Sequence, residues 1–315
     1  MTMLAEPDDS ELDEAVMPRS RHGAQPQHLL ITLLGDYWLG RNEHLPSAGL
    51  VDLLAEFGIS ATSARAALGR LTRRGLLHTS KSGRRTFYGL TPLAIRVLNE
   101  GLSRILSFGT ESTVPWDGTW LVLAFSVPEE QRDIRHALRS RLRWQGFAPL
   151  YDGVWVSPRS DDSAVKSIVS DLGVETATVL RSSALYPPTS GPGHPLSAWD
   201  LDELREAYDN FLDTYSPLLE RVRLGQVTSS EALVTRTNVM DTWRQFPGLD
   251  PELPSGALPE GWPRERSREI FSQVYDGLGP LAEMRVQQII GLYEPECAQG
   301  AKHHTIASAI AHLPQ

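Results

Sequence analysis

The chain has one cysteine and no long apolar run. The lone cysteine, Cys297, excludes an intramolecular disulfide, and no neighbouring Cys or His residues have the spacing of metal ligands. The longest apolar runs, LLITLL and WLVLAF, are far shorter than the roughly 20 residues that cross a bilayer. The N-terminus is acidic and lacks the basic flank and apolar region of a secretory signal. These absences predict a soluble cytoplasmic protein.

Carboxylates are also missing from one strongly basic segment. The whole chain carries a formal net charge of -9, yet residues 57–99 contain eight Lys or Arg residues and no Asp or Glu. The centre of this segment, from Ile59 to Thr91, reads ISATSARAALGRLTRRGLLHTSKSGRRTFYGLT. A solvated helix face normally mixes charges of both signs. Repulsion among like charges destabilises the fold unless a polyanion relieves it, so the segment predicts a nucleic-acid contact.

Composition divides the chain into a tail and three domains with short linkers between them. Residues 1–24 are acidic, have little to bury and predict a disordered tail. Glycine, threonine, serine and proline mark linkers after residue 108 and at 187–195. The predicted domains are residues 25–108, 116–186 and 196–315.

The first domain has the helix and strand signals of a winged helix-turn-helix. Apolar residues at helical spacing predict three helices, over 27–39, 46–57 and 61–74. The expected N-caps of the second and third are Ser47 and Ser60, and the expected terminating glycines are Gly58 and Gly75. Two strand-like pieces, 76–80 and 85–90, flank the turn KSGR. Thr91-Pro92 is typical of the start of a fourth helix.

The predicted helix 61–74 has one apolar face and one small, basic face. The apolar face repeats at i, i+3, i+4 and i+7 and contains Ala64, Ala67, Leu68 and Leu71. Small residues beside arginines suit a helix that enters a major groove about 12 Å wide. A basic hairpin tip can follow phosphates or enter a narrow minor groove. We therefore predict DNA contacts by Ser63, Arg65, Arg70, Arg73, Lys81, Arg84 and Arg85.

Longer stretches resemble the PaaX family of bacterial transcriptional repressors. TLLGDYWL, GISATSARAALGRLTRRGLL and SGRRTFYGLT are similar to its N-terminal domain. WDGTWLVLAFSVPEEQRDIRHALRSRLRWQGFAPLYDGVWVSP resembles its central domain, and DTWRQFPGLDPELPSGALPEGWP its C-terminal domain. The resemblance covers nearly the whole chain after residue 25. It implies a repressor that leaves its operator on binding an aryl-acetyl thioester, phenylacetyl-CoA in the best-known members, and that controls aromatic-acid degradation.

The second domain follows a β-α-β-α-β pattern, which is typical of a ferredoxin-like α/β sandwich. Its first helix carries one stripe of arginines, Arg132, Arg135, Arg139 and Arg143, opposite an apolar stripe of Ile134, Leu138 and Leu142. One interpretation is a solvated face paired with carboxylates such as Glu129, Glu130 and Asp133. The other is a site for the phosphates of a CoA-type effector, or an auxiliary operator contact, through Arg135, Arg139 and Arg143.

Aromatic residues of the C-terminal region also allow two interpretations. Trp243, Arg244 and Phe246 precede a proline-rich loop that contains Trp262. Aromatic rings beside an arginine can line an aryl-acyl pocket, and Trp243 and Arg244 are therefore candidate effector contacts. Aromatic residues at helical spacing also build cores. The same ambiguity applies to Trp116, Trp120, Trp144 and Trp155.

Catalytic and metal-binding motifs are missing from the sequence. GLGPLA, at 277–282, fits a dinucleotide fingerprint but follows a helical pattern rather than a strand and contains Pro280. His303 and His304 are adjacent, so on a helix they would point about 100° apart. No P-loop and no G-x-S-x-G motif occur, and no paired-carboxylate or nucleophile arrangement stands out. We expect no enzyme activity, no metal site and no cofactor, with the CoA thioester acting as an effector.

Together these features predict a multidomain α+β protein. Its parts are an N-terminal winged helix-turn-helix, a central ferredoxin-like α/β domain and a mainly helical C-terminal domain for effector sensing and dimerisation. We expect a homodimeric repressor of a phenylacetate-type catabolic pathway that binds double-stranded operator DNA and no membrane. One alternative is an activator or architectural DNA-binding protein without a CoA-thioester switch. Another is an enzyme or interaction module whose basic segment binds RNA or a protein.

Overall fold

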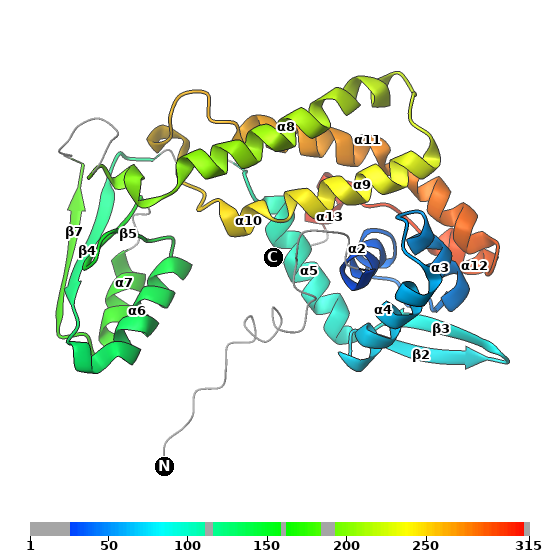
Figure 1. Cartoon of the computed structure of the whole chain (residues 1–315), viewed down its shortest axis with the longest axis horizontal. Coiled ribbons are helices and arrows are strands. Elements are labelled where there is room, and N and C mark those ends of the chain that lie inside the picture. Colours follow the sequence, from blue (N-terminus) through cyan, green and yellow to red (C-terminus); the bar gives the residue numbers. More distant parts are fainter. Residues whose placement is uncertain (1–25, 111–115, 159–161, 184–192, 312–315) are drawn as a thin grey trace, which may run out of the picture. The chain divides into compact units, whose positions relative to one another are not determined.

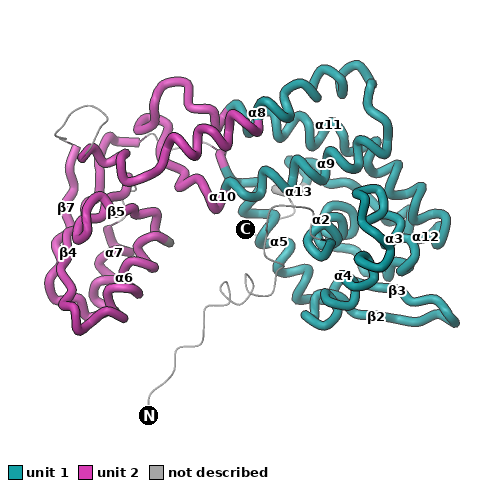
Figure 2. The backbone as a smooth tube through the Cα atoms, viewed as in Figure 1, with its two compact units in different colours: residues 1–108, 212–246, 266–315 teal, residues 109–211, 247–265 magenta. Residues whose placement is uncertain are grey.

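The computed structural model describes residues 26–110, 116–158, 162–183 and 193–311. The chain forms two compact units (Figure 2). Unit 1 contains residues 1–108, 212–246 and 266–315, and unit 2 contains residues 109–211 and 247–265. The C-terminal region 196–315 is thus shared between the two units. The predicted acidic tail, 1–24, lies outside the described residues.

Unit 1 begins with three helices and a small antiparallel sheet (Figure 1). The helices are α2 (Pro26–Trp38), α3 (Ser47–Ala55) and α4 (Ala61–Arg73). The strands are β1 (Leu45–Pro46), β2 (Leu77–Ser82) and β3 (Arg85–Leu90), in the order β1-β3-β2. Helix α5 (Pro92–Ser107) follows the hairpin. The four helices and the β2–β3 pair therefore lie where the sequence predicts them.

Side chains at the helix ends explain most of these boundaries. The Ser60 hydroxyl accepts a hydrogen bond from the backbone N–H of Ser63 at 3.3 Å and so caps α4. Thr91 caps α5 in the same way by accepting from Ala94 at 3.2 Å. The prediction that Ser47 caps α3 is wrong, because Ser47 is already the first helical residue and Pro46 occupies the N-cap position. Proline has no side-chain acceptor, so that cap makes no side-chain hydrogen bond.

A two-residue turn closes the β2–β3 hairpin. Ser82 pairs with Arg85, so Gly83 and Arg84 form the turn, and Gly83 has a φ of 61°. A glycine with positive φ at the first turn position is typical of a type II′ hairpin, whose twist matches that of the strands. The turn therefore holds Arg84 and Arg85 at the end of the hairpin.

The remaining helices of unit 1 come from the C-terminal region. They are α9 (Ser229–Trp243), most of α11 (Arg264–Gly291), α12 (Pro295–Gly300), α13 (Ile306–Ala311) and the second half of α8 (Leu201–Arg223). Their core is aromatic: the Trp243 ring stacks on Phe271 with centroids 4.9 Å apart, and Phe108 meets it edge-on. These ring contacts join the end of α5 to α9 and α11.

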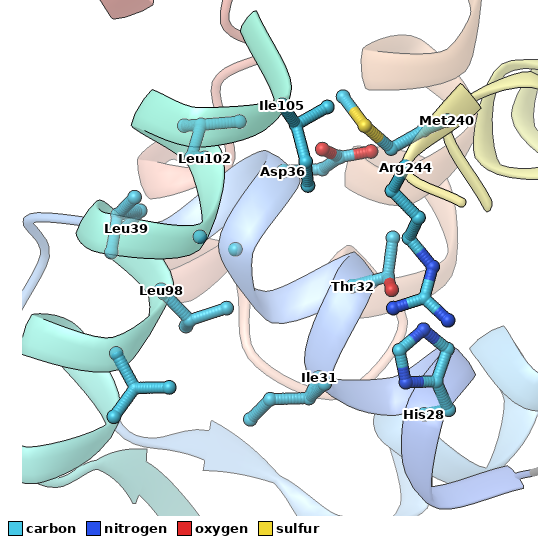
Figure 3. A pocket seen from close by; sticks show the side chains of 13 residues that line it. His28, Ile31, Thr32, Asp36, Leu39, Leu98, Leu102, Ile105, Met240 and Arg244 are labelled. Atoms are coloured by element: carbon cyan, nitrogen blue, oxygen red, sulfur yellow. The ribbon is translucent and has the colours of Figure 1, made fainter. Parts of the chain in front are cut away.

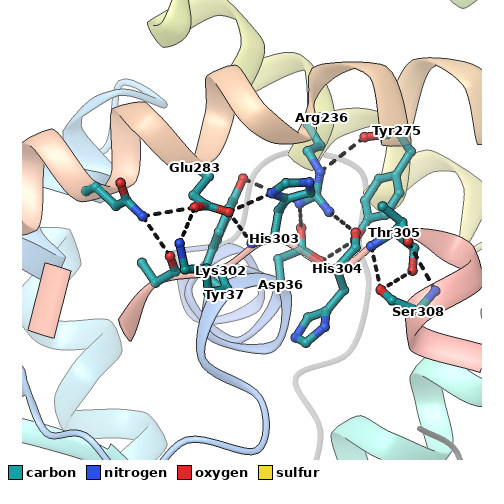
Figure 4. A network of polar contacts seen from close by, with 12 residues as sticks. Asp36, Tyr37, Arg236, Tyr275, Glu283, Lys302, His303, His304, Thr305 and Ser308 are labelled. Carbon is teal, nitrogen blue, oxygen red and sulfur yellow. Dashed lines mark hydrogen bonds and ion pairs between the residues drawn. The ribbon is translucent and has the colours of Figure 1, made fainter. Parts of the chain in front are cut away.

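A buried ion pair joins α2 to α9 inside this core (Figure 4). Arg236 is fully buried and its Nη1 donates to the Oδ2 atom of Asp36 at 3.1 Å. Its Nη2 donates to the carbonyl oxygen of His304 at 2.8 Å, and its Nε to that of Tyr275 at 3.2 Å. The Tyr275 hydroxyl donates to Asp36 Oδ1 at 2.8 Å. Burial raises the pKa of Asp36, while the charge of Arg236 acts in the opposite direction.

Unit 2 is built on a four-stranded antiparallel sheet in the order β5-β6-β4-β7. The strands are β4 (Trp120–Ser126), β5 (Ala148–Tyr151), β6 (Val154–Ser157) and β7 (Thr176–Ser182). The helices are α6 (Arg132–Trp144), after the 3-10 turn η1 (Glu129–Gln131), and α7 (Asp162–Asp171). Leu138, Leu142 and Val165 of these helices pack on Leu121, Leu123 and Trp155 of the sheet.

The opposite face of the sheet carries a second apolar cluster. Trp120 and Val156 pack there with Leu196 and Leu253, which come from the flanking segments. These segments include η2 (Pro195–Ala198), α10 (Phe246–Leu249) and η3 (Ser255–Ala257). Arg264 binds both carboxylate oxygens of Asp250 at 2.7 Å. This pair closes the segment 247–265 on itself, and the Tyr208 hydroxyl of α8 donates to Asp250 Oδ2 at 2.5 Å and so attaches the segment to the rest of unit 2.

Candidate nucleic-acid interface

Helix α4 separates its apolar and basic faces as the sequence predicts. Ala64, Ala67, Leu68 and Leu71 are fully buried. The outer face is made of exposed small and basic residues, namely Thr62, Ser63, Arg65, Ala66, Gly69 and Arg73. A Cβ built on Gly69 meets nothing within 4 Å, so another molecule can approach the backbone there. The buried face fixes the direction in which the arginines point.

The cations of α4 and of the hairpin differ in how far they are engaged by the rest of the protein. Arg65, Lys81 and Arg84 are exposed and, within the part of the chain that the structure describes, form no ion pair. Arg70 is half-buried, and its Nε is a buried donor without a hydrogen-bond partner among the described residues. Arg73 uses its Nε to bind the carbonyl oxygen of Gly69 at 3.4 Å. The hairpin itself extends beyond the helices of unit 1 (Figure 1).

Arg85 differs from the other hairpin cations because it already has an anionic partner. Its Nη1 donates to Glu294 Oε2 at 3.1 Å and to the carbonyl oxygen of Tyr293 at 3.3 Å. Its guanidinium also lies 5.4 Å from the ring centroid of Phe87. The Arg85 side chain is nevertheless 59% exposed, so solvent screens the ion pair and a phosphate could compete for it.

Two carboxylates on the N-terminal side of the basic segment, Asp52 and Glu56, bind the C-terminal region. Glu56 binds Arg285 of α11 through both oxygens, and the shorter contact is 2.7 Å. These hydrogen bonds lower the pKa of Glu56, so it stays ionised. Asp52 accepts a hydrogen bond from the Tyr293 hydroxyl. Both acids are therefore used to attach the helices to the C-terminal region and do not neutralise the outer face of α4.

Replacing Glu294 by glutamine should tighten DNA binding. The substitution removes the negative charge beside Arg85 and frees its guanidinium for phosphate. Because the ion pair is exposed, we expect only about a two- to fivefold lower Kd. Fluorescence anisotropy with a DNA duplex measures the change. Glu269→Gln is the matched control, since Glu269 pairs with the exposed Arg266 at 2.9 Å and lies far along the chain from the basic segment. Weaker binding by the Glu294 variant would exclude Arg85 as a DNA contact.

A histidine pair at the base of the hairpin was not recognised from the sequence. The Nε2 atoms of His44 and His78 lie 2.6 Å apart, and His44 Nδ1 lies 2.5 Å from the Ser80 hydroxyl. Burial lowers the pKa of His44, with the neighbouring His78 charge acting in the same direction. Within the described residues no group of three or more potential metal ligands occurs. The two histidines are separated by 34 positions, so no local pattern could have joined them.

The predicted arginines of α6 are all engaged. Arg135 Nη1 binds Glu129 at 2.8 Å and its Nη2 binds the carbonyl oxygen of Val127 at 2.7 Å. Arg139 binds Asp152 at 2.6 Å. Arg143 lies over the Trp155 ring at 5.3 Å from its centroid. These contacts fit the interpretation of a solvated, paired face, with Asp152 as a partner that sequence spacing does not reveal.

The two predicted effector contacts of the C-terminal region lie in different surroundings: Trp243 is in the core and Arg244 is at a cavity. Trp243 is fully buried among Phe108, Phe246 and Phe271, so it offers no surface to a ligand. The same holds for Trp120 and Trp155, which are core residues of unit 2. Arg244, one position beyond Trp243, lines a cavity instead.

The described structure defines a mixed α+β protein with an exposed basic face on a helix and hairpin. Three models of one family match this chain. A PaaX-like protein model matches residues 25–93, the PaaX protein central Cas2-like domain residues 113–192, and the PaaX-like protein C-terminal domain residues 199–288. The chain therefore belongs to the PaaX family, as its resemblance indicated.

Two proteins illustrate the similarity. The chain is 26% identical over 261 residues to the transcriptional repressor PaaX of Escherichia coli, with 81% of this chain and 80% of that protein covered. It also resembles the solved structure of the uncharacterized protein Rv0674 from Mycobacterium tuberculosis, with a TM-score of 0.53 and 24% identity. That match covers 84% of this chain and 98% of the other, and it supports the fold alone. In the described part of the chain, no helix is long and apolar enough to span a membrane.

Proposed function

We propose that this protein is a DNA-binding transcriptional repressor rather than an enzyme. The observation that carries the proposal is a set of three exposed cations, Arg65, Lys81 and Arg84, that form no ion pair among the described residues, while the nearby Glu56 is bound by Arg285. An uncompensated basic face favours the phosphate backbone of a duplex and makes binding salt-dependent. The similarity to the transcriptional repressor PaaX of Escherichia coli supports repression rather than activation of transcription.

In this proposal residues 25–108 form a winged helix-turn-helix, with α4 in the major groove and the β2–β3 hairpin as the wing. The helix order and the strand order β1-β3-β2 support it. The proposed contacts are Ser63, Arg65, Arg70, Arg73, Lys81, Arg84 and Arg85. Arg85 would exchange Glu294 for phosphate on binding.

The other two domains serve sensing and assembly in this proposal. Residues 116–186 are a ferredoxin-like domain, which the β-α-β-β-α-β order and the strand order β5-β6-β4-β7 support. Residues 196–315 sense the effector and form a homodimer. A two-fold dimer would present its helices to half-sites about one helical turn apart, or a multiple of it.

The proposed effector is an aryl-acetyl-CoA thioester that releases the operator of an aromatic-acid catabolic pathway. Membership of the PaaX family supports it. Arg135, Arg139 and Arg143 are the proposed phosphate contacts, and each would have to leave a present partner. Arg244 of unit 1 is a separate candidate for an effector contact.

Arg139→Ala should weaken the response to the thioester and leave the fold intact. Asp152, the ion-pair partner of Arg139, is 98% exposed, so the loss of this pair costs little stability. Titration of operator release with phenylacetyl-CoA measures the effect. Arg132→Ala is the matched control, because Arg132 lies on the same helix, is 80% exposed and is not a proposed effector contact. An unchanged titration for the Arg139 variant would reject the phosphate site.

Selection of bound genomic fragments in vitro, with and without phenylacetyl-CoA, tests the proposed function. We expect a defined set of duplex fragments that is depleted when the thioester is added. Selection that is indifferent to acyl-CoA thioesters would favour the activator or architectural alternative. Stronger anisotropy changes with RNA than with duplex DNA would favour the RNA-binding alternative.

A further inference from the structure

Unit 1 contains a cavity lined by α2, α5 and α9 (Figure 3). The cavity volume is ≈ 80 Å³. A single water needs only about 10–15 Å³ of such volume, so the cavity has room for a small organic molecule. Most of the wall is aliphatic and includes Leu98, Leu102, Ile105 and Met240. Such a wall selects a ligand with an apolar body.

One end of the cavity is cationic. Figure 3 shows the Arg244 guanidinium beside the His28 ring and the Thr32 hydroxyl, away from Leu98 and Leu102. Arg244 Nε donates to Asp241 Oδ1 at 2.8 Å. Its Nη2 is a buried donor that has no hydrogen-bond partner among the described residues. A buried charged donor without a partner is costly, and a ligand oxygen would satisfy it.

The acids near this end are already committed. Asp241 is shared by Arg244 and by His28, whose Nε2 lies 3.1 Å from Asp241 Oδ1. Asp36 also lines the cavity, but Arg236 and the Tyr275 hydroxyl bind its two oxygens. The Nη2 atom of Arg244 is therefore the donor that remains for an incoming anion. Because the negative charge of Asp241 lies beside it, a ligand with more than one negative charge would be repelled.

We propose that this cavity binds a small organic monocarboxylate. The carboxylate accepts hydrogen bonds from Arg244 Nη2 and the Thr32 hydroxyl, and the apolar body lies among Leu98, Leu102 and Met240. An amine would be repelled by Arg244, and a neutral ligand would lack the charge-assisted hydrogen bond. The site has one polar end only, so it does not suit the several phosphates of a nucleotide.

The position of the cavity suggests what the acid would control. Helix α2 lines the cavity and also packs against α4, the helix that carries Arg65 and Arg70. Asp36 on α2 belongs both to the cavity wall and to the buried ion pair with Arg236. An acid that orders this end of α2 would therefore change the free energy of placing α4 on DNA. This regulatory step rests on the proposed function, whereas the binding itself does not.

Isothermal titration calorimetry of the full chain tests the binding. The probes are hexanoate, cyclohexanecarboxylate and 3-phenylpropanoate, each compared with its primary amide and its amine. We expect at least one acid to bind about tenfold or more tightly than its amide, because hydrogen bonds to a charged group differ by this amount from neutral ones. Arg244→Gln should lose this preference for the acid. Arg266→Gln, at an exposed arginine outside the cavity, should keep it.

A second variant removes the cavity without touching the charges. Gly101 lines the cavity on α5, and a Cβ built there meets nothing within 4 Å. Gly101→Leu should therefore fold, fill part of the space and abolish acid binding. The proposal is overturned if no acid binds the parent, if acid and amide bind equally, or if both cavity variants bind like the parent. DNA binding of the same parent sample, measured without acid, separates this failure from a failure of the proposed function.

Discussion

Arg236→Met should destabilise the fold by about 3–5 kcal/mol, because it leaves the buried Asp36 carboxylate without its counter-charge. The substitution also removes the donors to the carbonyl oxygens of Tyr275 and His304. The cation–π contact of the Arg236 guanidinium, 3.8 Å from the Tyr275 ring centroid, is lost as well. Urea unfolding followed by circular dichroism measures the free energy of unfolding.

Two further variants make this test specific. Arg266→Met removes an exposed arginine paired with Glu269 and should cost about 1 kcal/mol or less. Adding Asp36→Asn to Arg236→Met removes the stranded charge and should restore part of the stability. A loss below about 1 kcal/mol for Arg236→Met would show that the ion pair does not hold α2 to α9.

Arg65→Ala and Arg70→Ala should each lower the affinity for a selected operator. A contact to phosphate weakens binding to all sequences, and the slope of log K against log salt falls by about one. A contact to a base edge costs about 1–3 kcal/mol and relaxes specificity at one position. The α4 backbone should be unaffected, since Ala64, Ala67, Leu68 and Leu71 form its buried face. Anisotropy titrations across a salt series distinguish the two kinds of contact.

Arg266→Ala serves as the control for total charge, because it removes one positive charge from unit 1 outside the basic segment. Equal affinity and equal salt slope for the parent and both α4 variants would remove α4 from the DNA interface. Arg70 differs from the exposed Arg65 in two respects. Its Nε is a buried donor without a partner among the described residues, and only part of its side chain is exposed.

Local sequence features predicted the elements that carry the basic face. The i, i+3, i+4, i+7 repeat of α4, the Ser60 cap and the Thr91 cap act within a few residues. A hydroxyl next to a helix start bonds the nearest free N–H, so this geometry follows from the sequence. The prediction for Ser47 failed for an equally local reason. Pro46, the residue before it, has an extended conformation and takes the N-cap position itself.

Long-range partners could not be predicted in the same way. Arg85 and Glu294 are 209 positions apart, and Asp36 and Arg236 are 200 positions apart. No spacing rule relates such residues, because only the packing of the C-terminal helices on α2 and α3 brings them together. Trp243 shows a second limit of the sequence. Aromatic residues at helical spacing are compatible with a ligand pocket and with a core, and only the burial of Trp243 in the structure shows that it is a core residue.

The decisive measurement attaches a DNA-cleaving iron chelate to α4. The chain makes this practical because Cys297 is its one cysteine and is buried. In a Cys297→Ala background, Thr62→Cys places the chelate on the outer face of α4, and Asp213→Cys places it at an exposed position of α8 as a control. We predict cleavage of a selected operator at defined positions for α4 and none above background for α8. Equal cleavage by the two, or none from α4, would contradict α4 as the DNA-reading helix.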